Sequence, residues 1–323
     1  MSDPILVTGA AGFIGRAVTR ALLDRGERVV GVDNLNAYYD PALKHARLET
    51  LAGPAFRFEQ ADIAEAPAMQ ALVAREGVTR IVHLAAQAGV RYSIDQPFSY
   101  QHANLAGHLA MLEAARHAPA CRHFVYASSS SVYGNQPLNG AAFREDEPAV
   151  APVSLYAATK RAGELMSQAY ATLYGLPQTG LRFFTVYGPW GRPDMAYFSF
   201  TRKILAGEPI AVFGEGRMAR DFTYIDDIVA GILGVLDRPP PAGENRLLNI
   251  GDSRPVGLMA MIETLERLLG REAVKQFQPM QPGDVTTTFA DVARLAALTG
   301  YHPQVMLEEG LARFVDWYRG FYG

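Results

Sequence analysis

Short apolar runs alternate with longer stretches of helical pattern through the first half of the chain. The apolar runs predict strands at residues 5–7, 28–32, 56–60, 80–84, 123–127 and 179–184, and the stretches between them predict helices near 13–25, 67–75, 100–116 and 155–174. Most of these strands are apolar throughout, which is typical of strands covered on both faces. Residues 56–60 alternate apolar and polar, so we expect that strand near an edge. The alternation predicts an α/β fold with a doubly wound parallel sheet.

The pattern becomes less regular after about Pro189. We expect helices near residues 197–206, 225–236, 256–269, 291–298 and 307–318, and strands at 210–213 and 247–250. The strand at 247–250 is predicted to rejoin the main sheet. We therefore predict a Rossmann-type domain of residues 1–188, rejoined by about 225–252, and a smaller, interleaved C-terminal substrate domain of residues 189–224 and 253–323.

The chain of 323 residues is about half hydrophobic, with a formal net charge of -3 and charges of both signs mixed along it. This balance gives no electrostatic reason to expect nucleic acid or an anionic membrane as a partner. One cysteine, Cys121, permits no internal disulfide, and no apolar stretch is long enough to span a bilayer. The first residues also show no basic and apolar leader. We expect a cytoplasmic protein without a metal site.

A glycine-rich loop follows the first predicted strand. Gly9, Gly12 and Gly15 are spaced G-x-x-G-x-x-G, with Phe13 and Ile14 opening the next helix. Such glycines permit a tight turn and a close approach of the backbone to a pyrophosphate, which sits on the unpaired N–H groups of the helix N-terminus. A glycine cluster alone also occurs in ordinary turns. Its place between a strand and a helix favours a dinucleotide site.

Asp33 lies eighteen positions after Gly15, at the end of the second predicted strand. A carboxylate there can accept hydrogen bonds from both adenosine ribose hydroxyls and repels a 2′-phosphate, so we expect NAD rather than NADP. The rest of the predicted cofactor site follows neighbouring strands: Asn34, Asp62, Ile63, Leu84, Ala85 and Ala86.

Tyr156 and Lys160 are four positions apart on a predicted helix and therefore share a face. Ser128–Ser131 follow the fifth strand, at the carboxyl edge of the sheet where such folds bind ligands. A free tyrosine has a pKa of about 10. A nearby ammonium and the positive nicotinamide favour the phenolate and lower that pKa. We expect Tyr156 to act as the base, a serine hydroxyl to hold the substrate oxygen, and NAD to take the hydride.

Longer strings in the chain resemble a known family. The glycine loop, the serine cluster, the Tyr156 and Lys160 pair and residues 182–189 (RFFTVYGP) resemble extended short-chain dehydrogenases/reductases that act on nucleotide sugars. More narrowly, residues 33–41 (DNLNAYYDP), 88–93 (AGVRYS) and 189–195 (PWGRPDM) resemble UDP-glucuronate 4-epimerases. The resemblance covers essentially the whole chain, and these longer strings are much more specific than the glycine motif.

The resemblance implies roles for individual residues. It makes Ser129 the hydroxyl of a triad with Tyr156 and Lys160, and Asn104 a support on the nicotinamide side. It also implies a substrate site, with a UDP-sugar held by Arg91, Ser130, Ser131, Thr185, Arg192, Arg220 and Asp284. For Arg192 and Arg220 there are plain alternatives, because each has an aspartate nearby, Asp194 and Asp221, with which it can pair. The resemblance further implies a homodimer through residues 100–116 and 155–174.

Three sugar reactions begin with oxidation at C4. A 4,6-dehydratase needs an acidic pair after the fifth strand, where this chain has serines. A UDP-glucuronate decarboxylase typically has glutamate where this chain has Ser131. We therefore expect C4 epimerisation of UDP-glucuronate to UDP-galacturonate, with the carboxylate held by Ser130, Ser131, Thr185 and Arg192. A UDP-glucose 4-epimerase is the main alternative. A dinucleotide-binding sensor is the non-enzyme alternative, and the intact Tyr156 and Lys160 pair argues against it.

Overall fold

The computed structural model describes residues 3–135, 141–280 and 287–323, and its centre is a seven-stranded parallel sheet. Its order is β10-β6-β5-β4-β1-β2-β3. The strands are β1 (Ile5–Thr8), β2 (Val29–Asp33), β3 (Phe56–Gln60), β4 (Arg80–His83), β5 (His123–Ser129), β6 (Gln178–Phe183) and β10 (Asn245–Ile250). The predicted parallel sheet is confirmed, and so is the edge position of β3. Residues 245–250 pair with β6, so this late strand does rejoin the main sheet.

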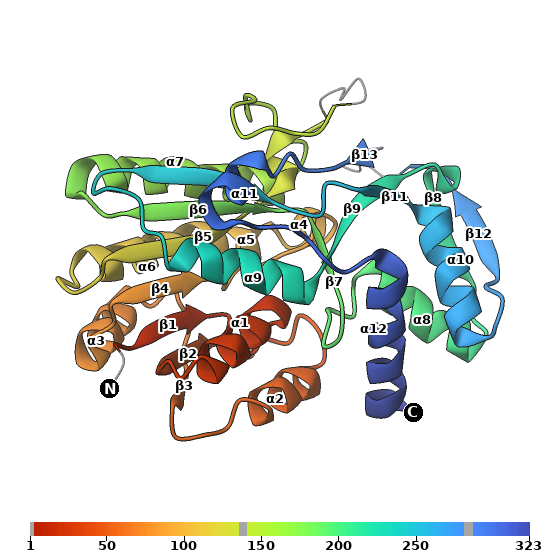
Figure 1. Cartoon of the computed structure of the whole chain (residues 1–323), viewed down its shortest axis with the longest axis horizontal. Helices are drawn as coiled ribbons and strands as arrows, with labels where there is room; N and C mark the ends of the chain where they lie inside the picture. Colours follow the sequence, from red (N-terminus) through yellow and green to blue (C-terminus); the bar gives the residue numbers. More distant parts are fainter. Residues whose placement is uncertain (1–2, 136–140, 281–286) are drawn as a thin grey trace.

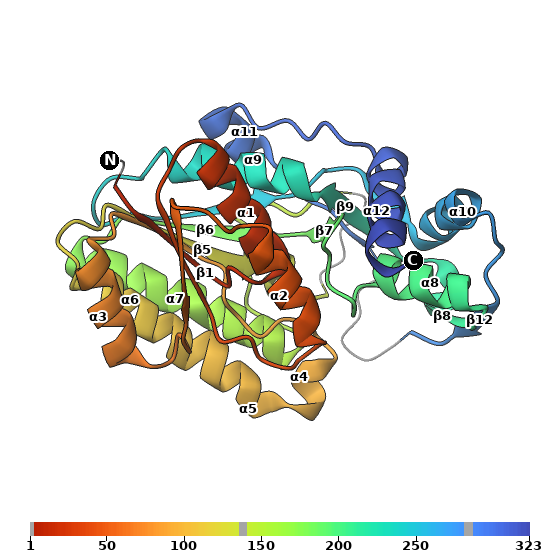
Figure 2. The same ribbon diagram turned by 90° about the horizontal axis from the view of Figure 1, so that it is seen from below.

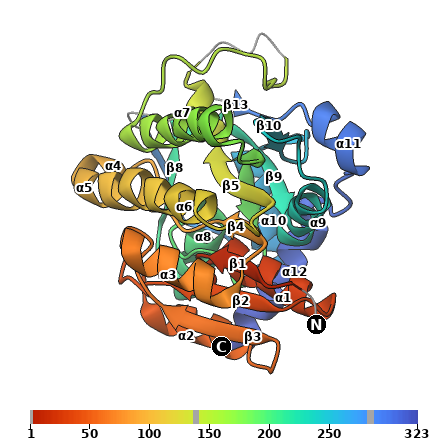
Figure 3. The ribbon, with the colours of Figure 1, turned by 90° about the vertical axis from the view of Figure 1, so that its left-hand side faces the viewer.

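Helices cover both faces of the sheet, as Figures 2 and 3 show. One face carries α1 (Phe13–Asp24), α9 (Ile225–Leu236) and α11 (Ala293–Thr299), and the other carries α3 (Ala66–Glu76), α6 (Gly107–Arg116) and α7 (Leu155–Tyr174). The side chain of Ser154 caps α7 by accepting a hydrogen bond from Ala157 N, and Gly175 ends the helix in a left-handed conformation. Both helix boundaries agree with the sequence prediction.

A smaller group of elements lies beyond the carboxyl ends of the strands, on the right in Figure 1. It contains α8 (Ala196–Ala206), α10 (Leu258–Leu269) and α12 (Leu307–Tyr322), with β8 (Ile210–Phe213) paired to β12 (Lys275–Gln278). A second small sheet joins β7 (Thr185–Tyr187), β9 (Ala219–Tyr224), β11 (Pro255–Gly257) and β13 (Thr287–Thr288). The division into interleaved domains remains a prediction.

Several elements differ from the sequence prediction. The helix expected at 256–269 begins only at Leu258, because Val256 pairs with Arg220 in a small sheet. The helix expected at 100–116 is present, but it begins earlier, with α5 (Pro97–Tyr100), and continues through a π-helical turn at Gln101–Ala106 into α6. The short helix α4 (Tyr92–Asp95) before it was not predicted. The helix α2 (Pro41–Glu49) was not predicted, although Asp40 caps it and proline stands at its start.

Candidate active site

The loop after β1 has the geometry of a dinucleotide cradle. Gly9 has a φ of 72°, and a Cβ on Gly9 would lie 2.9 Å from Ala85 N. A Cβ on Gly15 would lie 1.9 Å from Gly9 O, so the loop and the first turn of α1 pack together only without side chains. No described side chain caps α1 at Gly12, which leaves its first N–H groups for a ligand, and residues 12–15 line a cavity. These residues fit a pyrophosphate.

Asp33 is almost fully buried at the end of β2, where the sequence placed it. Its carboxylate accepts hydrogen bonds from Ala11 N at 3.2 Å and Leu35 N at 2.9 Å. The Lys44 ammonium lies 3.9 Å from Asp33 Oδ1 and donates to the backbone and side-chain oxygens of Asn36. Asp33 is thus fixed beside the glycine loop, where it can meet an adenosine ribose.

A cavity of about 710 Å³ runs from the glycine loop to the small second sheet. It brings together nearly all of the predicted site residues. Its lining includes Gly9, Gly12, Phe13, Ile14, Gly15, Asp33, Asn34, Asp62, Ile63, Leu84, Ala85, Ala86, Arg91, Ser129, Ser130, Ser131, Tyr156, Lys160, Thr185, Arg192 and Arg220. Two predicted residues are not in it: Asn104 lies behind the cavity wall, and Asp284 falls outside the described residues.

Ser129, Tyr156 and Lys160 meet in the middle of this cavity. Ser131 Oγ donates to Ser129 Oγ at 2.9 Å, and Ser131 N donates to the same oxygen at 3.2 Å. Since Ser129 already accepts twice, its own hydroxyl is left to donate, and it lowers the pKa of the neighbouring Tyr156. Lys160 Nζ donates to Ala127 O at 2.9 Å. Tyr156 is therefore the end of a directed serine chain.

Burial and nearby groups act in opposite directions on the pKa of Tyr156. Burial raises the pKa of the Tyr156 phenol, and the Ser129 hydrogen bond and the Arg192 charge oppose that rise. Arg192 is a cation that favours the phenolate, a role that was not predicted from the sequence. The prediction that the Lys160 ammonium and the nicotinamide lower this pKa stays a prediction. Lys160 is itself buried and donates to the Ala127 carbonyl, and burial lowers its pKa to about 8.

Ser128 belongs to the support of the site rather than to the hydroxyl chain. Its Oγ donates to Glu164 Oε1 at 2.6 Å, and Glu164 also accepts from Nε and Nη2 of the buried Arg182 at 2.8 and 2.9 Å. Asn104 has a comparable supporting position. It donates to Gln87 O and to Thr159 Oγ1, each at 3.0 Å, and so ties the loop after β4 to α7.

Arg192 faces the cavity but pairs with Asp194. Its Nε and Nη2 lie 3.0 and 2.5 Å from the two carboxylate oxygens of Asp194. Tyr38 Oη donates to the same carboxylate at 3.1 Å, and burial raises the pKa of Tyr38 to about 12. The ion pair that was the alternative at the sequence level is present. Arg192 nevertheless lines the cavity and acts electrostatically on Tyr156.

The other cations of the predicted substrate site lie farther along the cavity. The Arg91 guanidinium stacks over the Phe213 ring at 4.6 Å from its centre, and Arg220 donates to Ala219 O at 2.9 Å. The Asp221 carboxylate, which was the alternative partner of Arg220, is fully buried and accepts from the backbone N–H groups of Asp252, Ser253 and Ala290.

Some cavity residues had not been predicted from the sequence. They include Asn36, Tyr38, Lys44, Phe213 and Met218. The first three belong to the 33–41 string or its helix, so their position was indicated by the motif even though no role was assigned.

Among the described residues, no cluster of acidic, histidine or cysteine side chains is arranged to hold a metal ion. In the same part of the chain, no helix is long and apolar enough to cross a membrane.

A glycine-rich dinucleotide cradle, a serine–tyrosine–lysine group and a carboxyl-edge cavity together define a dinucleotide-dependent enzyme. Residues 5–251 match the model of the NAD dependent epimerase/dehydratase family, and the chain belongs to that family.

Named relatives narrow the comparison. The chain is 47% identical to a probable UDP-glucuronate 4-epimerase of Rhizobium meliloti, over 97% of this chain and 96% of that protein. It is 47% identical to UDP-glucuronate 4-epimerase 1 of Arabidopsis thaliana, over 99% of this chain and 77% of that protein. The crystal structure of UDP-glucuronic acid 4-epimerase from Bacillus cereus, in complex with UDP-glucuronic acid and NAD, superposes with a TM-score of 0.92 at 35% identity, covering 99% of this chain and all of that one.

We expect the wild-type protein to bind NAD much more tightly than NADP. Asp33→Asn keeps the size and an oxygen acceptor but removes the negative charge. The Lys44 ammonium, which lies 3.9 Å from Asp33 Oδ1, stays beside the position of the ribose. The ratio of the NADP to the NAD dissociation constant should then fall by about tenfold or more, which corresponds to one charge-assisted hydrogen bond. Calorimetric titration of both dinucleotides measures this. Equal binding of NAD and NADP by the wild type would contradict the assignment of Asp33.

Proposed function

We propose that this protein is an NAD-dependent UDP-glucuronate 4-epimerase, which interconverts UDP-glucuronate and UDP-galacturonate. The observation that carries the proposal is the position of Arg192. It places a guanidinium beside Tyr156, in a cavity wall that also contains the hydroxyls of Ser130, Ser131 and Thr185. A cation with neighbouring neutral donors is the chemistry that recognises a carboxylate. The relatives named above support the same sugar.

The residues of the chain account for the proton chemistry. Tyr156 takes the proton of the C4 hydroxyl, and Ser129, directed by Ser131, donates a hydrogen bond to the same oxygen. The glycine loop and Asp33 would hold NAD, which would supply reversible hydride transfer at C4. Once the sugar has turned in the cavity and presents its other face, Tyr156 gives the proton back to the C4 oxygen.

A 4-keto uronate is a β-keto acid and loses carbon dioxide easily. An epimerase must therefore hold the carboxylate away from the orientation, perpendicular to the ketone, in which that bond breaks. Ser131 stands where decarboxylases typically have glutamate, and here its hydroxyl donates to Ser129. Arg192 and the neighbouring hydroxyls then hold the carboxylate during turnover.

One observation favours a second candidate, a UDP-glucose 4-epimerase. Arg192 is already neutralised by Asp194, with Tyr38 as a further donor to the same carboxylate. A compensated guanidinium has a weaker preference for a negatively charged sugar. This candidate predicts that UDP-glucose is the better substrate.

Incubating the protein with UDP-glucuronate, UDP-glucose or neither sugar, and resolving the nucleotide sugars formed, tests the proposal. We expect UDP-galacturonate from UDP-glucuronate, no pentose, and slower conversion of UDP-glucose. A pentose product would assign a decarboxylase, and a preference for UDP-glucose would assign the second candidate. No turnover of either sugar would favour a dinucleotide-binding sensor.

A homodimer in the cytoplasm is part of the same proposal. The surface formed by α5, α6 and α7 exposes Phe98, Leu109, Leu165 and Leu173, and these helices lie along one side of the molecule in Figure 2. Apolar side chains gathered in this way are typical of an interface. We expect sedimentation analysis to show a dimer, and Leu165→Glu with Phe98→Glu to give a monomer. A wild-type monomer at micromolar concentration would contradict this.

The half-buried Cys121, whose thiol donates to His123 O, fits a reducing compartment.

A further inference from the structure

Arg47, on α2, is a fully buried arginine that the proposed chemistry does not use. Its relative exposure is 0%. Figures 1 and 2 show α2 beside the carboxyl edge of the sheet, near the segment that follows β7 and near α12. Among the described residues, no carboxylate pairs with Arg47. Burying an arginine without a counter-charge is costly, so its hydrogen bonds must be nearly complete for the fold to tolerate it.

All of the guanidinium N–H groups of Arg47 have acceptors. Nε and Nη2 donate to Trp190 O at 3.1 and 2.6 Å, and Nη2 also donates to Gly191 O at 2.9 Å. Nη1 donates to Ala11 O at 3.1 Å and to Tyr39 Oη at 2.6 Å. A guanidinium has five such donors in a fixed plane. The site is therefore shaped for arginine, because a lysine ammonium has only three donors at one point.

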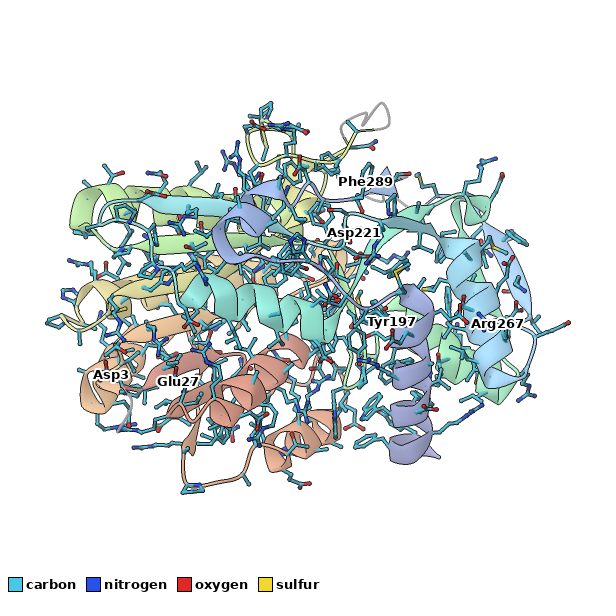
Figure 4. The ribbon with its side chains drawn as sticks, viewed as in Figure 1. Asp3, Glu27, Tyr197, Asp221, Arg267 and Phe289 are labelled. Atoms are coloured by element: carbon cyan, nitrogen blue, oxygen red, sulfur yellow. The ribbon has the colours of Figure 1, made fainter. Side chains whose placement is uncertain are left out.

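These acceptors belong to two parts of the active site. Ala11 lies in the glycine loop that cradles the dinucleotide, whereas Trp190 and Gly191 immediately precede Arg192. The backbone around Arg192 needs support, since Trp190 has a φ of 63°, a left-handed conformation that is uncommon for a large side chain. Gly191 is equally constrained, because a Cβ there would lie 1.8 Å from Tyr197 Oη. Tyr197 lies beside α12, as Figure 4 shows.

A second contact holds the same loop from the same side. Tyr38, which precedes α2, donates to Asp194, and Asp194 binds Arg192 through both oxygens. Arg192 is thus flanked by one contact at the carbonyls before it and another at the carboxylate after it. Both come from the segment that follows β2 and Asp33.

We propose that Arg47 is a positioning residue for sugar specificity, which holds Arg192 at a fixed distance from the dinucleotide loop through the carbonyls of Trp190 and Gly191. This inference rests on the proposed function, because it assigns Arg192 to the uronate carboxylate. Arg47 does not line the cavity, so it acts on the sugar through Arg192 rather than by contact. Misplacing a reacting or binding group by about 1 Å can cost about 10²-fold.

The test compares dissociation constants for UDP-glucuronate and UDP-glucose by calorimetry in the dinucleotide-loaded protein. Arg47→Met removes the donors and retains much of the side-chain length, and Arg47→Lys retains the charge. We expect either variant to reduce the preference for UDP-glucuronate by about tenfold, as for one charge-assisted contact. If Arg47→Met does not fold, the preference for UDP-glucuronate measured with Arg47→Lys tests the inference.

A matched control is Arg16→Met. The Arg16 guanidinium lies 5.2 Å from the centre of the Trp190 ring and contacts the side chain rather than the carbonyl. This control should leave the ratio of the two dissociation constants unchanged, even if it lowers the melting temperature.

The decisive comparison is made in an Arg192→Ala background. There, Arg47→Met or Arg47→Lys should leave the ratio unchanged, because two residues that act through one contact are not additive. The inference would be overturned if the Arg47 variants lost affinity equally for both sugars in the wild-type background. It would also be overturned if they changed the ratio of the two dissociation constants as much in the Arg192→Ala background as in the wild type. A wild type with no preference for UDP-glucuronate would instead overturn the proposed function.

Discussion

Tyr156→Phe is expected to reduce turnover of UDP-glucuronate by about 10²–10⁴-fold, the usual contribution of general acid–base catalysis, while the dinucleotide stays bound. The phenyl ring keeps the packing against Tyr100, whose ring centre lies 6.0 Å away, but loses the oxygen that takes the C4 proton. Steady-state kinetics and the dinucleotide content of the purified protein measure the two effects.

Tyr92→Phe is a matched control for this variant. Tyr92 lines the same cavity and packs on Tyr38, with ring centres 4.7 Å apart, but it has no place in the hydroxyl chain. Its loss should affect turnover far less. Near wild-type activity of Tyr156→Phe would show that another group is the base.

Arg192→Ala is expected to lower the apparent affinity for UDP-glucuronate by about one to two decades, since a hydrogen bond to a charged group contributes about 1.5–3 kcal/mol. UDP-glucose has no carboxylate, so its KM should change little. The variant should also release some pentose, because the carboxylate of the 4-keto intermediate is freer to turn. Kinetics on both sugars with product analysis measures this.

The conservative variant Arg192→Lys separates charge from geometry. It retains a cation but cannot form the bidentate contact with Asp194 that holds the guanidinium in place. We expect the affinity of Arg192→Lys for UDP-glucuronate to lie between those of the wild type and Arg192→Ala. Equal increases in KM for the two sugars in Arg192→Ala would show that Arg192 supports the loop and does not contact the sugar.

The parallel sheet could be predicted because most of its strands are buried on both faces and therefore consist largely of apolar residues. Strand β10 was found in the same way, although it lies far from β6 in sequence. The small sheet formed by β7, β9, β11 and β13 could not be predicted. Its strands are short, and β13 has only two residues, so their pairing depends on tertiary packing rather than on periodicity. The π-helical turn at Gln101–Ala106 likewise has no signal in the apolar spacing.

The candidate site was predictable where a residue type is needed at a fixed place on the sheet. The Gly9–Gly15 loop, Asp33 and the Tyr156 and Lys160 pair are of this kind. The contacts that tune the site were not predictable, because they join segments distant in sequence. Arg47 reaches Trp190 across 143 positions, and Tyr38 reaches Asp194 across 156. Sequence patterns also gave no means of weighing the burial of Tyr156 against the charges around it.

In the proposed reaction, the C4 hydrogen leaves the sugar and returns to the same carbon without entering solvent. The test uses UDP-glucuronate labelled with deuterium at C4, with the product analysed by mass spectrometry and NMR in ordinary water. We expect UDP-galacturonate that retains the deuterium at C4. UDP-galacturonate that has exchanged its C4 label for solvent hydrogen would contradict it.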